Sequence, residues 1–86
     1  MEKYCKSIDE LCTEMDNIIS NKKLEHTDLE VGTSDTGQLL FRGLFCYSKT
    51  EYDVLNYLTS DFSQKEKLKE LMTEYLKKCS QVPSSN

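Results

Sequence analysis

Apolar side chains recur at helical intervals over the first 23 residues. The positions are spaced by four, three, four and three residues, and they are Tyr4, Ile8, Leu11, Met15 and Ile18. Such a series lies on one face of an α-helix, as in the seam of a coiled coil. A neighbouring series widens this stripe, and it consists of Cys5, Cys12 and Ile19. Because a wide stripe suits packing in a globular bundle, we predict an amphipathic helix over about residues 2–23.

A second amphipathic helix is predicted near the C-terminus. The segment Ser63–Glu66 has the spacing of a capping box, in which a serine and a glutamate satisfy backbone N–H groups at the start of a helix. Helical spacing continues through Leu68, Leu71, Met72, Tyr75, Leu76 and Cys79. The periodicity ends after Ser80, so we expect residues 81–86 to form a flexible tail.

A shorter helix is predicted just before this one. The segment Ser48–Glu51 repeats the capping-box spacing, and Tyr52, Leu55 and Leu58 follow at helical intervals. Only residues 60–62 separate it from the last helix. We therefore expect the two to pack together as a helical hairpin.

The hydrophobic pattern does not decide whether residues 29–47 form a helix or strands. The segment Gly32–Gly37 is a loop by composition, and residues 39–47 are apolar on nearly every side. A β-hairpin would pair residues 29–31 with this run, although the run contains no β-branched residue. A helix would use Asp35 as its cap and would have to tolerate Gly43 at a cost of about 1 kcal/mol. We favour the helix and keep the hairpin as the alternative.

These segments together predict a mainly α fold. We expect a small helical bundle with long N-terminal and C-terminal helices, in one domain over residues 1–80 with a tail at 81–86. The alternative fold is α+β, with a central β-hairpin at residues 29–47.

Composition and charge narrow the classes of function. A chain of 86 residues buries only about 60% of its unfolded surface, which leaves little room for a deep catalytic cleft. The formal net charge of -4 disfavours nucleic acid as a ligand, because phosphate-binding domains carry a basic excess. No apolar run approaches the roughly 20 residues of a membrane span, and the charged first residues lack the apolar block of a signal peptide. We expect a cytoplasmic or nuclear protein that binds neither nucleic acid nor membrane.

The four cysteines do not predict disulfides or a metal site. On one helix, Cys5 and Cys12 would have Cα atoms about 10.5 Å apart, whereas a disulfide needs about 7 Å or less. The sequence contains no Cys-x-x-Cys pair. We expect reduced cysteines that serve as small apolar residues, with no metal and no cofactor.

Two short motifs resemble catalytic ones and are interpreted otherwise. Gly32 and Gly37 have the glycine spacing of a phosphate-binding loop, but Gln38 stands at the lysine position. The tripeptide at Asp35 also occurs in aspartic proteases, in which paired carboxylates share a proton. Those enzymes are mostly β, whereas helices are predicted here, so a turn or cap is the favoured role of Asp35. The single histidine, His26, is expected in a solvated loop. We predict no catalytic residue.

By elimination, the sequence predicts a small protein-interaction module rather than an enzyme. Bulky apolar stripes on so short a chain favour association, with a protein partner, as an adaptor or subunit of a complex, or as a homo-oligomer. The candidate contacts are a helix-pairing face and a segment around the only arginine, and they are Ile8, Leu11, Met15, Ile18, Phe41, Arg42, Leu44 and Phe45. A regulatory or host-directed inhibitor that blocks a target protein is the first alternative. A dimeric aspartic-type hydrolase that uses Asp35 is the second.

Overall fold

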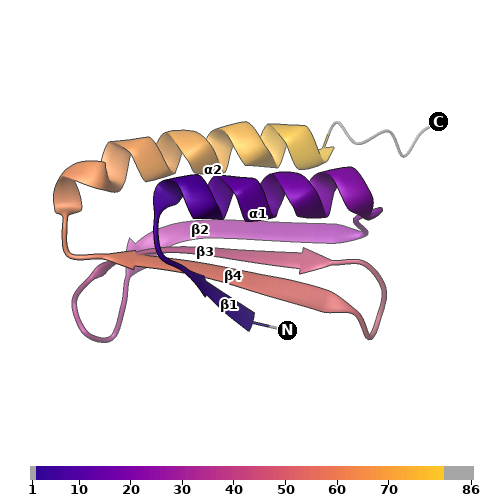
Figure 1. Ribbon diagram of the computed structural model, residues 1–86, viewed down its shortest axis with the longest axis horizontal. Coiled ribbons are helices and arrows are strands. Elements are labelled where there is room, and N and C mark those ends of the chain that lie inside the picture. Colours follow the sequence, from indigo (N-terminus) through magenta and orange to yellow (C-terminus); the bar gives the residue numbers. More distant parts are fainter. Residues whose placement is uncertain (1, 81–86) are drawn as a thin grey trace.

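The computed structural model describes residues 2–80 and shows one mixed β-sheet with two α-helices on the same side of it (Figure 1). The predicted tail at 81–86 lies outside the described residues. The elements follow in the order β1 (Glu2–Cys5), α1 (Ile8–Asn21), β2 (His26–Thr33), β3 (Leu39–Cys46), β4 (Tyr52–Thr59), a short 3-10 turn η1 (Phe62–Gln64) and α2 (Lys65–Ser80).

The sheet joins the first strand to the last one. Its order is β1-β4-β3-β2, with antiparallel pairs β2–β3 and β3–β4 and a parallel pair β1–β4. Helix α1 therefore carries the chain from β1 at one edge to β2 at the opposite edge. Helix α1 packs over β1 and β4, and α2 packs over β2, so the two helices cover one whole face of the sheet (Figure 1).

The predicted mainly α fold is wrong, and so are the helical bundle and the helical hairpin; the apolar seam at residues 4–18 is also not that of a coiled coil. The protein is α+β, with a four-stranded sheet. The alternative with a central hairpin at 29–47 describes β2 and β3, but residues 52–59, predicted as a helix, form β4. The run at 39–46 misled the prediction because it is apolar on both faces. Its odd residues enter the core while Leu40 and Leu44 line the other face, which hides the two-residue period of a strand.

The predicted capping box at Ser48–Glu51 forms hydrogen bonds of the expected kind but starts no helix. The Ser48 hydroxyl accepts hydrogen bonds from the N–H groups of Thr50 at 3.3 Å and Glu51 at 3.1 Å. The Glu51 carbonyl accepts one from the Tyr47 N–H at 2.9 Å. These bonds close the turn between β3 and β4 and start no helix, because strand pairing continues on both sides.

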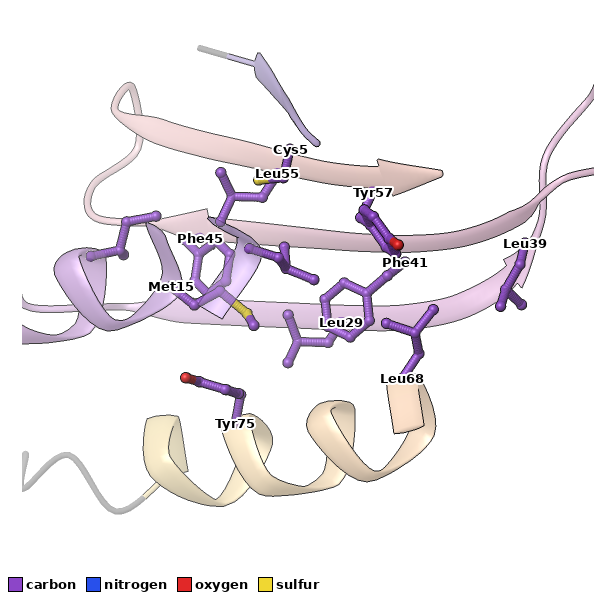
Figure 2. Close-up of a cluster of buried hydrophobic side chains, with 12 residues drawn as sticks. Cys5, Met15, Leu29, Leu39, Phe41, Phe45, Leu55, Tyr57, Leu68 and Tyr75 are labelled. Atoms are coloured by element: carbon purple, nitrogen blue, oxygen red, sulfur yellow. The ribbon is translucent and has the colours of Figure 1, made fainter. Parts of the chain in front are cut away.

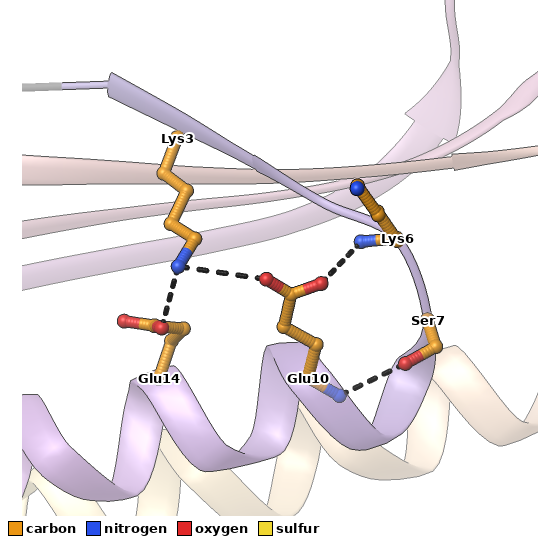
Figure 3. A network of polar contacts seen from close by, with 5 residues as sticks. All are labelled: Lys3, Lys6, Ser7, Glu10 and Glu14. Atoms are coloured by element: carbon orange, nitrogen blue, oxygen red, sulfur yellow. Dashed lines mark hydrogen bonds and ion pairs between the residues drawn. The ribbon is translucent and has the colours of Figure 1, made fainter.

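Helix α1 begins at Ile8 rather than at residue 2. The Ser7 hydroxyl accepts the Glu10 N–H at 3.1 Å, and the Glu10 carboxylate accepts the Lys6 N–H at 2.8 Å (Figure 3). This reciprocal cap ends β1 and starts the helix. The pattern Ser-x-x-Glu at Ser7–Glu10 was available in the sequence and could have placed this boundary. Cys5 consequently lies on a strand, so the helical spacing assumed for Cys5 and Cys12 is wrong.

The core fills the space between the sheet and the helices (Figure 2). Fully buried side chains come from both layers, and they are Leu11, Met15, Leu39, Phe41, Phe45 and Leu68. Burying one such side chain stabilises the fold by about 1.5–3 kcal/mol. Most of the apolar stripes predicted for the first and last helices are therefore covered by the sheet of the same chain, while Tyr4 and Leu76 remain exposed.

Candidate protein-binding face of the sheet

Side chains alternate across each strand, and in this sheet the alternation coincides with residue numbering. The odd-numbered residues of β1 to β4 face the helices and include Cys5, Leu29, Phe41, Leu55 and Tyr57 of the core. The even-numbered residues point to the opposite side, which no described element covers. We call this side the open face. Its residues are Glu2, Tyr4, His26, Asp28, Glu30, Gly32, Leu40, Arg42, Leu44, Cys46, Tyr52, Val54, Asn56 and Leu58.

The centre of the open face is a polar pair between two apolar pairs. Strand register places Leu40 beside Leu58, Arg42 beside Asn56 and Leu44 beside Val54. The leucines are half-buried and Val54 is only 8% exposed, so this part of the face is apolar and well packed. Two large aromatic side chains stand further out, since Tyr4 is 60% and Tyr52 is 50% exposed.

Arg42 is exposed and has no partner within residues 2–80. No hydrogen bond, ion pair or ring contact joins its guanidinium to another described residue, although Glu30 stands opposite it on β2. The other neighbour, Asn56, is buried, and its side-chain amide donates to the Glu2 carboxylate at 2.8 Å. Arg42 therefore keeps up to five N–H donors for a ligand from outside the chain.

Two shallow hollows border Arg42. One has a volume of about 210 Å³ and is lined by Asp28, Glu30, Arg42, Leu44 and Val54. The other has a volume of about 330 Å³, and its lining includes Glu2, Tyr4, Leu40, Arg42, Asn56 and Leu58. Each hollow combines leucine side chains with carboxylates at its rim. Such a surface can receive side chains of another protein, and it contains no enclosed cleft for a small substrate.

The predicted contact residues are distributed over both sides of the sheet. Five of them are buried in the chain's own core, namely Leu11, Met15, Ile18, Phe41 and Phe45, while Ile8 packs against that core. Arg42 and Leu44 lie on the open face. The predicted helix-pairing face thus packs against the sheet of the same chain. The residues that prediction missed are Tyr4, Leu40, Tyr52, Val54 and Leu58, which the alternation along β3 and β4 could have revealed.

The candidate catalytic and metal-binding residues are not brought together. Asp35 is exposed in the β2–β3 turn, which Gly37 completes at φ +83. Strands flank this turn, so the helices expected around Asp35 are absent there. His26 is exposed at the start of β2 rather than in a loop. Within residues 2–80, no group of three or more His, Cys, Asp or Glu side chains is placed to hold a metal ion.

The cysteines are all free, and Cys5 is buried. Burial raises the pKa of the Cys5 thiol to about 11, because desolvation disfavours the thiolate. At neutral pH this thiol is protonated and unreactive. None of the helices in the described part of the chain is long and apolar enough to cross a membrane.

The open face is therefore the candidate functional site, because its exposed arginine and aromatic side chains are accessible to a ligand. Comparisons of this chain with protein-family models, with curated protein sequences and with solved structures gave no match.

Proposed function

We propose that this protein is a small non-enzymatic inhibitor that binds a target protein through its open face and blocks the surface it covers. The observation that carries the proposal is Arg42, an exposed and unpartnered arginine between two apolar residue pairs. Arginine is over-represented among the residues that dominate binding energy, because it combines a planar set of donors with apolar stacking surface.

The distribution of apolar surface supports an inhibitor over an adaptor that pairs through its helices. The stripe of α1 packs on the sheet, as do Leu68 and Tyr75 of α2, so neither helix offers a continuous helix-pairing seam. The open face is carried on four hydrogen-bonded strands. A preformed surface of this kind loses little conformational entropy on binding, which favours tight cover of one target site.

Charge complementarity indicates the kind of target. Glu2, Asp28 and Glu30 place three carboxylates on the open face against one guanidinium. The target surface should therefore have an apolar centre, a carboxylate or carbonyl acceptor for Arg42, and basic side chains at its rim. Two copies of the open face would bring like carboxylates together, so we propose a different protein as the partner. Four cysteines without disulfides suit action in the cytoplasm or nucleus, where thiols stay reduced.

The test compares two charge reversals of equal size on opposite sides of the molecule. Arg42→Glu alters the open face, and Lys67→Glu alters the exposed surface of α2. A protein retained by the immobilised wild type would be purified, and its own activity would be assayed with each variant. We expect the wild type and Lys67→Glu to bind and inhibit it at equal molar amounts, and Arg42→Glu to lose both effects. Equal binding by Arg42→Glu, or binding that leaves the target fully active, would overturn the proposal.

Sedimentation of the purified protein tests the choice of partner. We expect a monomer at micromolar concentrations. A dimer that dissociates on the Arg42→Glu substitution would show that the open face binds a second copy, and it would replace the proposed inhibitor with a self-associating module.

A further inference from the structure

Strand β2 is an edge strand of eight residues, and within residues 2–80 one side of its backbone has no neighbouring strand. The Ser34 N–H donates to the Gln38 carbonyl at 2.8 Å where the β2–β3 hairpin closes. Antiparallel pairs alternate between bonded and non-bonded residues, so the even residues of β2 turn their N–H and C=O groups toward β3. The backbone groups of Thr27, Leu29, Val31 and Thr33 consequently point outward from the sheet.

Helix α2 forms a wall along this outer edge. Lys65, Lys69, Met72, Leu76 and Cys79 follow one another at intervals of three or four residues and lie on one side of the helix. Lys65 and Lys69 border a hollow of about 230 Å³ at the Thr33 end of β2. Leu76 and Cys79 border another of about 250 Å³ at the His26 end.

The middle of this wall is apolar. Met72 is half-buried, and Leu76 is a large hydrophobic side chain that remains 38% exposed. On β2, Val31 is half-buried on the helix side of the strand and borders the same hollow as Lys65 and Lys69. The outer edge of β2 and this side of α2 thus border two hollows, one at each end of the strand. We call the two hollows and the strand edge between them the groove.

We propose that this groove binds an extended peptide segment as a fifth strand of the sheet, with basic and apolar side chains in alternation. Side chains of an added strand alternate between the two sides of the sheet. One set would lie on the open-face side, beside Asp28 and Glu30. The other set would lie under α2, against Val31, Met72 and Leu76. The carboxylates on one side of β2 therefore favour a basic residue of the ligand, and the apolar side chains on the other side favour an apolar residue at the next position.

The same carboxylates disfavour a second copy of this chain as the occupant. Antiparallel pairing of two β2 strands gathers Asp28 and Glu30 of both copies on one side of the joined sheet, and like charges across strands are destabilising. A basic peptide removes this repulsion and adds cross-strand attraction. The groove shares Asp28 and Glu30 with the open face but uses neither Arg42 nor the leucines of that face, so variants of Arg42 distinguish this proposal from the proposed function.

The test uses synthetic peptides of alternating lysine and valine, with alternating glutamate and valine as the control. Binding is followed through the backbone amide resonances of β2. We expect the lysine peptide to shift the resonances at Thr27, Val31 and Thr33 and the glutamate peptide to leave them unchanged. The double substitution Asp28→Lys and Glu30→Lys should reverse this preference.

Backbone methylation separates strand addition from simple charge attraction. Two further lysine–valine peptides carry N-methyl groups either on every lysine or on every valine. Because only alternate N–H groups of a strand face its neighbour, one peptide should lose binding and the other should retain it. Equal binding of both methylated peptides and the parent would overturn the proposal.

A change in the protein provides the reciprocal test. Val31→Pro removes one outward N–H without removing a bond to β3, and proline is tolerated at such edge positions. Loss of one hydrogen bond should weaken peptide binding about tenfold. Arg42→Glu should retain the peptide, so failure of this groove and failure of the open face give different results. If Val31→Pro does not fold, the methylated peptides decide the question on the wild type.

Discussion

The two faces of strand β3 use neighbouring residues for different purposes. Phe41 and Phe45 point toward the helices and are fully buried, whereas Arg42 and Leu44 point to the open face. On the covered face, shape and volume determine which residues fit, because the space is filled by α1 and α2. On the open face, charge and hydrogen-bonding capacity remain available. A single strand therefore carries both the stability of the fold and the chemistry of the candidate site.

The largest expected effect is a loss of stability on the covered face. Phe41→Ala leaves a cavity among fully buried side chains and should lower the free energy of unfolding by about 3–5 kcal/mol. Leu40→Ala, one residue away on the open face, should cost about 1 kcal/mol. Urea denaturation measures both. Equal losses would show that the open face is packed as tightly as the core, which would contradict the comparison.

Substitutions of two glycines should change stability by an intermediate amount and again distinguish a packed position from an open one. A Cβ atom on Gly43 would lie 2.8 Å from Phe45 Cε1 and 2.9 Å from Leu29 Cδ2. Gly43→Ala should therefore cost about 1–3 kcal/mol through overpacking. Nothing lies within 4 Å of a Cβ on Gly32, so Gly32→Ala should be neutral or stabilise by up to about 1 kcal/mol. The midpoint of urea denaturation should therefore fall for Gly43→Ala and stay unchanged or rise for Gly32→Ala. A fall of equal size in both variants would contradict this prediction.

Arg42→Glu should lower the free energy of unfolding by no more than about 1 kcal/mol, because Arg42 has no partner within the described residues to lose and the new carboxylate meets the like charge of Glu30 across β2. Thermal unfolding compared with the wild type provides the measurement. A large loss of stability would mean that Arg42 supports the fold, and its use as a binding probe would then be invalid.

The smallest expected effect concerns pH and the cap that joins β1 to α1. The hydrogen bond from the Lys6 N–H and the contact with Lys3 hold the pKa of Glu10 below its ordinary value of 4.5 (Figure 3). A carboxyl group whose pKa is lowered by folding stabilises the protein above its unfolded pKa, and this stabilisation is lost as the pH falls through the folded pKa.

Glu10→Gln should therefore flatten the decline in stability below about pH 4.5, as followed by thermal unfolding at a series of acidic pH values. The Asp61 carboxyl, whose pKa the Ser63 hydroxyl and N–H lower, should keep its own contribution in that variant. An unchanged acid profile would contradict the role of Glu10 in the cap.

The local signals of the sequence were sound within single helices. Leu68 and Tyr75 are buried as the C-terminal stripe predicts, and α2 spans Lys65–Ser80. Leu11, Met15 and Ile18 likewise form one buried helical face on α1. These features depend on side chains three or four residues apart, so the sequence alone could specify them. For the candidate site, it singled out Arg42 and Leu44 but placed them together with the buried Phe41 and Phe45.

Tertiary contacts decided the remaining features. Ser48 and Glu51 can start a helix or close a turn with the same hydrogen bonds, and only the pairing of β3 with β4 selects the turn. Residues 2–5 become a strand because β4 lies beside them, and Glu2 bonds to Asn56 across 54 positions of sequence. No local pattern records a neighbour that distant. The same long-range pairing divides the apolar run at residues 39–46 between a core face and the open face. The candidate site could therefore be identified only from the sheet.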